Sequence, residues 1–176
     1  NNMTGNQLIT ADPLPTLYNV GSSSNTYCAG SSVNITLSGS EAGVNYQLKV
    51  NGIDEDPPSP GTGSSLTWNN KTSGVYTIVG ANSVTSCTNN MTGSQIITLT
   101  PSPTPSISGN NDVCPNATGV NYSTPFVAGN TYNWIITGGT FSGSGNSITV
   151  NWGATGPGTV RVAETITATG CSVTTT

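Results

Sequence analysis

The segment NNMTGSQIITLTPSPT, residues Asn89–Thr104, has a close copy at Asn1–Thr16, which reads NNMTGNQLITADPLPT. Eleven of the 16 aligned positions are identical, at an offset of 88 residues. Self-similarity at a fixed period is the signature of a repeated structural unit. The repeat therefore predicts that this chain is built from copies of one small domain.

The similarity continues beyond this segment, with small changes of offset that indicate insertions or deletions in loops. Matched positions, first at an offset of 86 and later at 84, are Cys28 with Cys114, Tyr46–Val50 with Tyr132–Ile136, Trp68 with Trp152, and Cys87 with Cys171.

Proline-rich stretches mark the boundaries of the units. Pro13-Leu14-Pro15 and the segment 101–105 are stiff, extended linkers, and their prolines cannot donate ladder hydrogen bonds. We expect unit one at 13–100 and unit two at 101–176, with its last strand incomplete, while residues 1–12 match the final strand of a preceding unit. Neighbouring units are then expected on both sides, in the same polypeptide or by strand exchange between subunits.

Alternating apolar and polar residues within each unit predict short strands. Val33–Leu37, Tyr46–Val50, Tyr132–Ile136 and Ile148–Trp152 alternate in this way. Turn signals such as Asn51-Gly52 end the runs. Because no stretch has helical periodicity, we expect an all-β chain of tandem immunoglobulin-like sandwiches with helix content close to nil.

Each unit carries two cysteines at matched positions. We expect the disulfides Cys28–Cys87 and Cys114–Cys171, each closed within its own unit. Metal binding is the alternative, but the chain has no CxxC motif and no histidine. On the chain-entropy model, closing a loop of nearly 60 residues stabilises a domain by roughly 4 kcal/mol.

Composition excludes several classes of function. Three basic and seven acidic side chains leave no positive surface for nucleic acid, and no apolar run reaches the roughly 18 residues that span a bilayer. The absence of histidine removes the commonest general base. Few basic residues and an even number of cysteines fit a secreted, extracellular protein. We expect no enzymatic activity, no nucleic-acid partner and no membrane insertion.

One acidic cluster, Asp54-Glu55-Asp56, lies in a proline-rich segment that we interpret as a loop. Hard oxygen ligands gathered in such a loop suit calcium, which is the functional interpretation. A solvated loop is the simpler one, and we favour it. Apart from this calcium alternative, we expect no cofactor.

The large aromatic residues could form either a core or a platform for sugars. Trp134 lies in the middle of an alternating run, and the matched residue of unit one is the apolar Leu48. Matched tryptophans likewise favour packing over ligand contact. We therefore expect a core that includes Tyr46, Leu48, Trp68, Tyr132, Trp134 and Trp152.

Unit two combines Val113-Cys114-Pro115, a run from Tyr132 to Gly139, Ile148–Gly153 and Gly170-Cys171-Ser172. This set resembles the PKD-like and immunoglobulin-like tandem repeats of large cell-surface proteins of Bacteroidota, among them gliding-motility adhesins and other cargo of type IX secretion. The resemblance is looser over unit one. It implies exported, non-catalytic modules and no ligand-binding residue.

These observations favour a structural repeat in an extracellular adhesin stalk or surface filament, whose partners are neighbouring repeats and, at the cell surface, polysaccharide. Two alternatives stay open at this point. The first is a carbohydrate-binding accessory module of a secreted enzyme, which predicts exposed, coplanar aromatic side chains. The second is a self-assembling fibre subunit in which residues 1–12 complete the open sheet of a neighbour's unit two.

Overall fold

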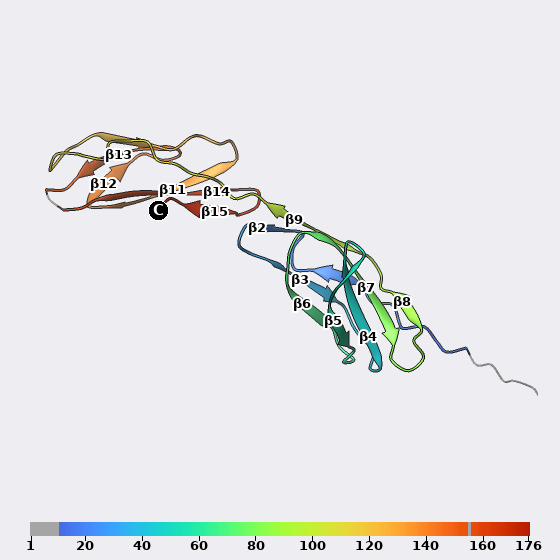
Figure 1. The fold of residues 1–176 in the computed structure, drawn as a ribbon. Helices are drawn as coiled ribbons and strands as arrows, with labels where there is room; N and C mark the ends of the chain where they lie inside the picture. The colour runs from blue at the N-terminus through green and yellow to red at the C-terminus, as the bar shows by residue number, and fades with distance from the viewer. Residues whose placement is uncertain (1–10, 155) are drawn as a thin grey trace, which may run out of the picture. The chain divides into compact units, whose positions relative to one another are not determined.

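The computed structural model of the protein describes residues 11–154 and 156–176, and every regular element in these ranges is a β-strand (Figure 1). The all-β prediction is confirmed, and no helix that could cross a bilayer occurs in these ranges. The expected strand at 1–12 lies almost entirely outside the described residues. Contacts divide the chain into two units. The first consists of the described residues up to Tyr27 and of Ser31–Leu99, and the second of Thr100–Thr176 together with the short segment Cys28–Gly30.

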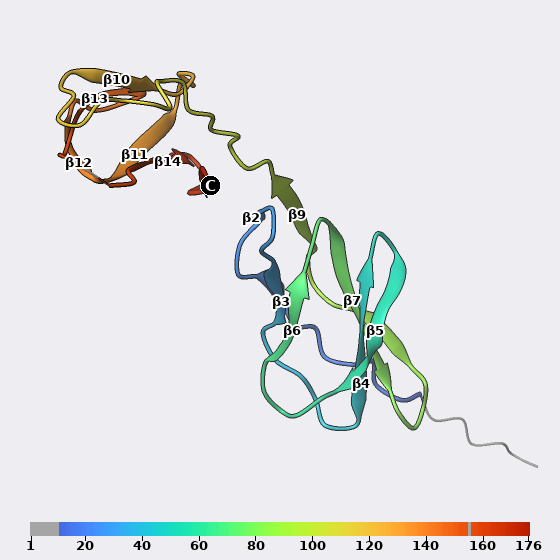
Figure 2. The ribbon, with the colours of Figure 1, turned by 60° about the vertical axis from the view of Figure 1, so that its left-hand side comes forward.

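Nine strands in two sheets make up the first unit, although the last residues of β2 and β9, Cys28 and Thr100, group with the second unit. They are β1 (Val20–Ser22), β2 (Thr26–Cys28), β3 (Val33–Leu37), β4 (Val44–Val50), β5 (Ile53–Pro60), β6 (Leu66–Lys71), β7 (Gly74–Asn82), β8 (Thr88–Asn90) and β9 (Gln95–Thr100). One sheet has the order β1-β3-β6; the other has the order β2-β9-β7-β4-β5, with β8 paired to β7. Figure 2 shows β4, β5 and β7 side by side.

The two sheets of the first unit enclose one apolar core, as the alternation of the strands requires. In β3, and in β4 as far as Leu48, every second side chain is buried. The turn between β4 and β5 consists of Asn51 and Gly52, both with positive φ (51° and 82°), as a tight two-residue hairpin demands. The buried core residues are Val20, Val33, Ile35, Leu37, Val44, Tyr46, Leu48, Trp68, Tyr76, Ile78, Met91 and Ile97.

The second unit contains two three-stranded sheets (Figure 2). Its strands are β10 (Val120–Ser123), β11 (Asn130–Thr137), β12 (Gly139–Ser142), β13 (Ser147–Trp152), β14 (Thr159–Ile166) and β15 (Ser172–Thr174). The sheet orders are β10-β13-β12 and β11-β14-β15. A smaller core of Tyr122, Trp134, Ile148, Val150 and Val162 lies within this unit.

The central strand pairs of the two units share one register. Leu48 of β4 pairs with Ile78 of β7, and Trp134 of β11 pairs with Val162 of β14. The offsets between these residues are 86 and 84, which are the offsets of the sequence repeat. Residues matched in the sequence therefore hold equivalent places in the two sheets.

The acidic segment Ile53–Pro60 is strand β5, which corrects our interpretation of it as a loop. Its prolines do not prevent this, because β5 lies at the edge of its sheet, where one side of the backbone needs no strand partner. The ladder with β4 is interrupted by a register shift between Tyr46 and Leu48. Asp56, in the same part of β5, has a φ of 60°.

Candidate functional site

Among the described residues, one disulfide is present, between Cys28 and Cys171, whose Cα atoms are 5.5 Å apart. Cys28 is the last residue of β2, and Cys171 lies directly before β15. Cys87 and Cys114 are free thiols. The structure therefore corrects both expected pairs, Cys28–Cys87 and Cys114–Cys171.

The length of β7 explains why Cys28 and Cys87 do not meet. Cys87 lies just beyond the last residue of β7, where its carbonyl accepts a hydrogen bond from the N–H of Asn82 (2.9 Å). Cys28 lies toward the other end, because β2 accompanies β9, and β9 pairs with the first three residues of β7. The nine residues of β7 span roughly 26 Å, whereas disulfide-bonded Cα atoms lie within about 7 Å.

The second unit repeats this arrangement. The carbonyl of Cys171 accepts a hydrogen bond from Ile166, the last residue of β14 (2.9 Å). Cys114 instead lines a hollow together with Gly156 and Gly158, which precede β14. The repeat in the sequence therefore shows which cysteines occupy equivalent positions in the two units, but it does not show which cysteines are bonded to each other.

The residues expected in the core differ in how deeply they are buried. Tyr46, Leu48, Trp68 and Trp134 are buried, while Tyr132 and Trp152 are half-buried and pack against the second core. The matched tryptophans are not equivalent in the sheets. Trp68 pairs with Ile35 inside its sheet, whereas Trp152 ends β13 and pairs with Gly139.

The acidic cluster of β5 faces lysines. Lys71 pairs with Asp56 and lies 3.6 Å from a carboxylate oxygen of Glu55, and Lys49 pairs with Asp54. No group of three or more potential metal ligands gathers within residues 11–154 and 156–176. An ammonium group beside each carboxylate opposes a second cation by charge, so the donor set does not fit calcium well.

Lys71 is the most deeply buried charge of this cluster, with 6% of its surface exposed. Burial by itself lowers the pKa of its ammonium group, but the hydrogen bond to Asp56 and the negative charges of Glu55 and Asp56 raise it, and the net pKa lies above the ordinary value. Lys71 is therefore charged at neutral pH. It holds the end of β6 against the bulged part of β5.

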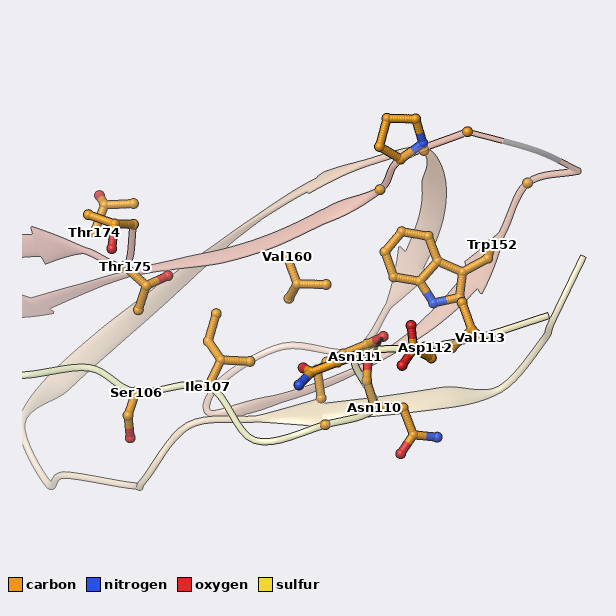
Figure 3. Close-up of a pocket in the computed structure, with 18 of the residues that line it drawn as sticks. Ser106, Ile107, Asn110, Asn111, Asp112, Val113, Trp152, Val160, Thr174 and Thr175 are labelled. Atoms are coloured by element: carbon orange, nitrogen blue, oxygen red, sulfur yellow. Dashed lines mark hydrogen bonds between the residues drawn. The ribbon is translucent and has the colours of Figure 1, made fainter. Parts of the chain in front are cut away.

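A hollow of about 940 Å³ opens in the second unit (Figure 3). It runs between the segment 105–115 and the beginning of β14, and Thr174–Thr176 border it. In Figure 3, Ile107 and Val160 face each other across this hollow. The indole Nε1 of Trp152, which also lines it, has no hydrogen-bond partner among the described residues. Nothing in the sequence pattern alone indicated this feature.

Comparison with known proteins gives one family match. The family model of the PKD-like domain matches residues 100–176, the second unit. A solved structure named "Marsupial T cell receptor" is similar to this chain at 13% identity and a TM-score of 0.33, over 97% of this chain and 64% of that one. This chain thus spans less than two thirds of that structure's length. No curated protein matches.

Proposed function

We propose that this chain is a non-catalytic structural repeat of an extracellular adhesin stalk or surface filament. The PKD-like match supports an extracellular structural module, since such domains are generally non-catalytic. A disulfide persists in oxidising surroundings such as the cell exterior. The setting that we propose, from the resemblance of the second repeat, is a surface array of the gliding-motility or type IX secretion class in Bacteroidota.

The observation that carries this proposal is the extent of the disulfide. Its two cysteines are 143 residues apart, so the bond closes a loop that contains every strand from β3 to β14. A force applied to the ends of the chain is therefore carried by a covalent bond and not by the ladders of these strands. On the chain-entropy model, a loop of this length also stabilises the folded state by about 5 kcal/mol.

The positions of the tryptophans count against a carbohydrate-binding accessory module. Such a module presents aromatic rings side by side on an exposed face. Here Trp68 and Trp134 are buried, and Trp152 is half-buried. Surface polysaccharide remains a proposed ligand class of the assembled array, and neighbouring repeats are its proposed structural partners.

The complete coding sequence around this chain tests the proposal. A structural array predicts many further copies of the unit, each with two cysteines at the matched positions. A hydrolase or other catalytic domain beside only two such units would contradict it. Labelling of intact cells with an antibody against the folded chain tests the proposed location, because an array at the cell surface must be accessible to antibody without lysis.

A further inference from the structure

The edge strand β5 contains a bulge opposite Gln47. The ladder between β4 and β5 shifts in register between Tyr46 and Leu48, so that Gln47 alone lies opposite the three residues 56–58. All three of these residues are exposed. Extra residues in one strand bend it and re-aim its side chains, and such bulges are common beside functional sites. The bulge therefore presents an irregular stretch of backbone that water can reach.

Asp56, the first residue of this bulge, has an unusual backbone conformation for a residue that precedes a proline. Its φ is 60°, in the left-handed region. The ring of a following proline favours extended conformations of the preceding residue, with φ of about −120°. A residue held outside its ordinary region stores strain that the surrounding contacts maintain. Breaking the Asp56–Pro57 bond releases this strain, because no proline then follows Asp56.

The carbonyl of the same peptide bond accepts a hydrogen bond from a side chain. The amide Nε2 of Gln47 lies 3.1 Å from the carbonyl oxygen of Asp56. The same amide donates to the carbonyls of Leu48 (2.7 Å) and Glu55 (3.1 Å), which fix its position. A fixed donor on a carbonyl oxygen stabilises the negative charge that develops there when a nucleophile adds to the carbonyl carbon. Gln47 is thus placed to assist attack on the Asp56–Pro57 bond.

The carboxylate of Asp56 is held by a buried charge. The Nζ of Lys71 donates a hydrogen bond to Oδ2 of Asp56 and lies 3.6 Å from a carboxylate oxygen of Glu55. This ion pair restricts the rotation of the Asp56 side chain, so less ordering is needed before the carboxylate reacts. Because Lys71 engages Oδ2, the other oxygen, Oδ1, is the one that serves as a nucleophile.

We propose that the Asp56–Pro57 peptide bond is a site of intramolecular cleavage, at which the side chain of Asp56 cuts its own backbone. Oδ1 adds to the carbonyl carbon of Asp56 and forms a five-membered cyclic anhydride. The bond from this carbon to the proline nitrogen breaks, and the nitrogen leaves as an ammonium group after taking two protons from solvent. Water then opens the anhydride to two carboxylates and returns two protons. In sum, one water molecule is consumed for one peptide bond broken.

The disulfide keeps the cut chain together. The cleaved bond lies between Cys28 and Cys171 in the sequence, so the fragments 1–56 and 57–176 remain joined by the disulfide. A covalent path through this disulfide still connects the two ends of the chain. The reaction occurs once in each molecule, without turnover, and is therefore a modification of a structural module. It goes beyond the proposed structural role and does not depend on it.

A second Asp-Pro bond in the chain, Asp12–Pro13, serves as an internal control. Asp12 is exposed, lies outside every strand and has no positive φ. The full chain is incubated at pH 5 and 37 °C and then reduced, and mass spectrometry measures the fragments that end at residues 12 and 56.

We expect cleavage after Asp56 to be at least about tenfold faster than cleavage after Asp12 in the folded chain. In the reduced chain unfolded in urea, the two bonds should break at similar rates, because both are then ordinary Asp-Pro bonds. No cleavage after Asp56, equal rates at the two bonds in the folded chain, or the same preference in urea would overturn the proposal.

Two variants test the roles of the side chains. Asp56→Glu keeps a carboxylate for Lys71 but needs a less favourable six-membered ring, so cleavage after position 56 should be lost. Gln47→Met removes the donor at similar volume and should slow this cleavage at least about tenfold. In both variants, cleavage after Asp12 should keep its wild-type rate, and urea unfolding checks that they are folded. An unchanged rate at position 56 in either variant contradicts the mechanism, while the gene-context test of the structural role is unaffected.

Discussion

Cys28 is bonded to Cys171, although the residue that matches Cys28 in the repeat is Cys114 and the residue that matches Cys171 is Cys87. The bond thus joins the first cysteine of one repeat to the second cysteine of the next. The two cysteines left over are the equivalents of the two that are bonded.

Replacement of Cys28 and Cys171 by serine should lower the free energy of unfolding substantially, by up to about 5 kcal/mol. Replacement of Cys87 and Cys114 should change it by less than about 1 kcal/mol, because these thiols make no bond. Urea unfolding without reductant compares the two double variants. Equal losses in both, or a loss only in the second, would show that the pairing is different.

The Lys71 cluster predicts a loss of stability at alkaline pH. Because the folded-state pKa of Lys71 is raised above 10.5, its contribution is complete below that pH and is lost as the pH rises through the folded-state pKa. Burial also raises the pKa values of Tyr46 and Tyr76 above 10.0. Ionisation of these phenols therefore also destabilises the folded protein as the pH rises. Unfolding followed from pH 8 to 12 measures the combined effect.

The Lys71→Met variant separates the lysine from the tyrosines. At neutral pH we expect it to lose about 2 kcal/mol, since it removes the charged hydrogen-bond donor of Asp56 and the positive charge 3.6 Å from Glu55. Its stability should also decline less steeply above pH 10.5 than that of the wild type, while Lys49→Met, at a more exposed pair, serves as the matched control. Parallel pH profiles of the wild type and Lys71→Met would refute this role of the ion pair.

Glu41 predicts an effect at acidic pH. The side chain of Thr16 and then its backbone N–H donate hydrogen bonds to this carboxylate, and they lower its pKa below 4.5. The stability they provide is present above pH 4.5 and is lost as the pH falls through the folded-state pKa. Glu41→Gln should therefore flatten the profile between pH 5 and 3, with a total effect under about 1 kcal/mol for so exposed a pair. If stability falls between pH 5 and 3 as steeply in this variant as in the wild type, the hydrogen bonds between Thr16 and Glu41 do not stabilise the protein.

Calcium provides a further test of the acidic strand. Since Asp54, Glu55 and Asp56 each have a lysine nearby, we expect millimolar calcium to leave the melting temperature within 1 °C of its value in a chelator. Differential scanning calorimetry measures this directly. A rise of several degrees that is abolished by Asp56→Asn would instead establish a calcium site.

Much of the fold could be predicted from the repeat in the sequence. Its offsets of 86 and 84 already related Trp134 and Val162 to Leu48 and Ile78, and the structure pairs these residues in equivalent places. This works because strand register is set by alternating burial, which is a local pattern that duplication preserves. The tight turn at Asn51-Gly52 was also predictable from the local sequence, because these two residue types favour the positive φ that the turn requires.

The misassigned features depend on distant parts of the chain. The strand β5 exists because an edge position tolerates proline, and edge positions are a property of the whole sheet. The length of β7 excludes Cys87 as the partner of Cys28, and the spacing of the cysteines along the sequence does not show this length. The hollow beside Val160 is lined by residues from separate stretches of the second unit, among them Ile107, Trp152 and Thr175, so no local pattern in the sequence could indicate it.

Extension of single molecules held at residues 1 and 176 tests most directly that one bond closes the chain. Without reductant, only the residues outside the Cys28–Cys171 loop can extend, about 110 Å in total at roughly 3.4 Å per residue. With reductant, the 143 residues of the loop should add about 490 Å of contour length. Pairing within each repeat would add only about 390 Å on reduction, and equal extension in both conditions would show that no bond carries the load.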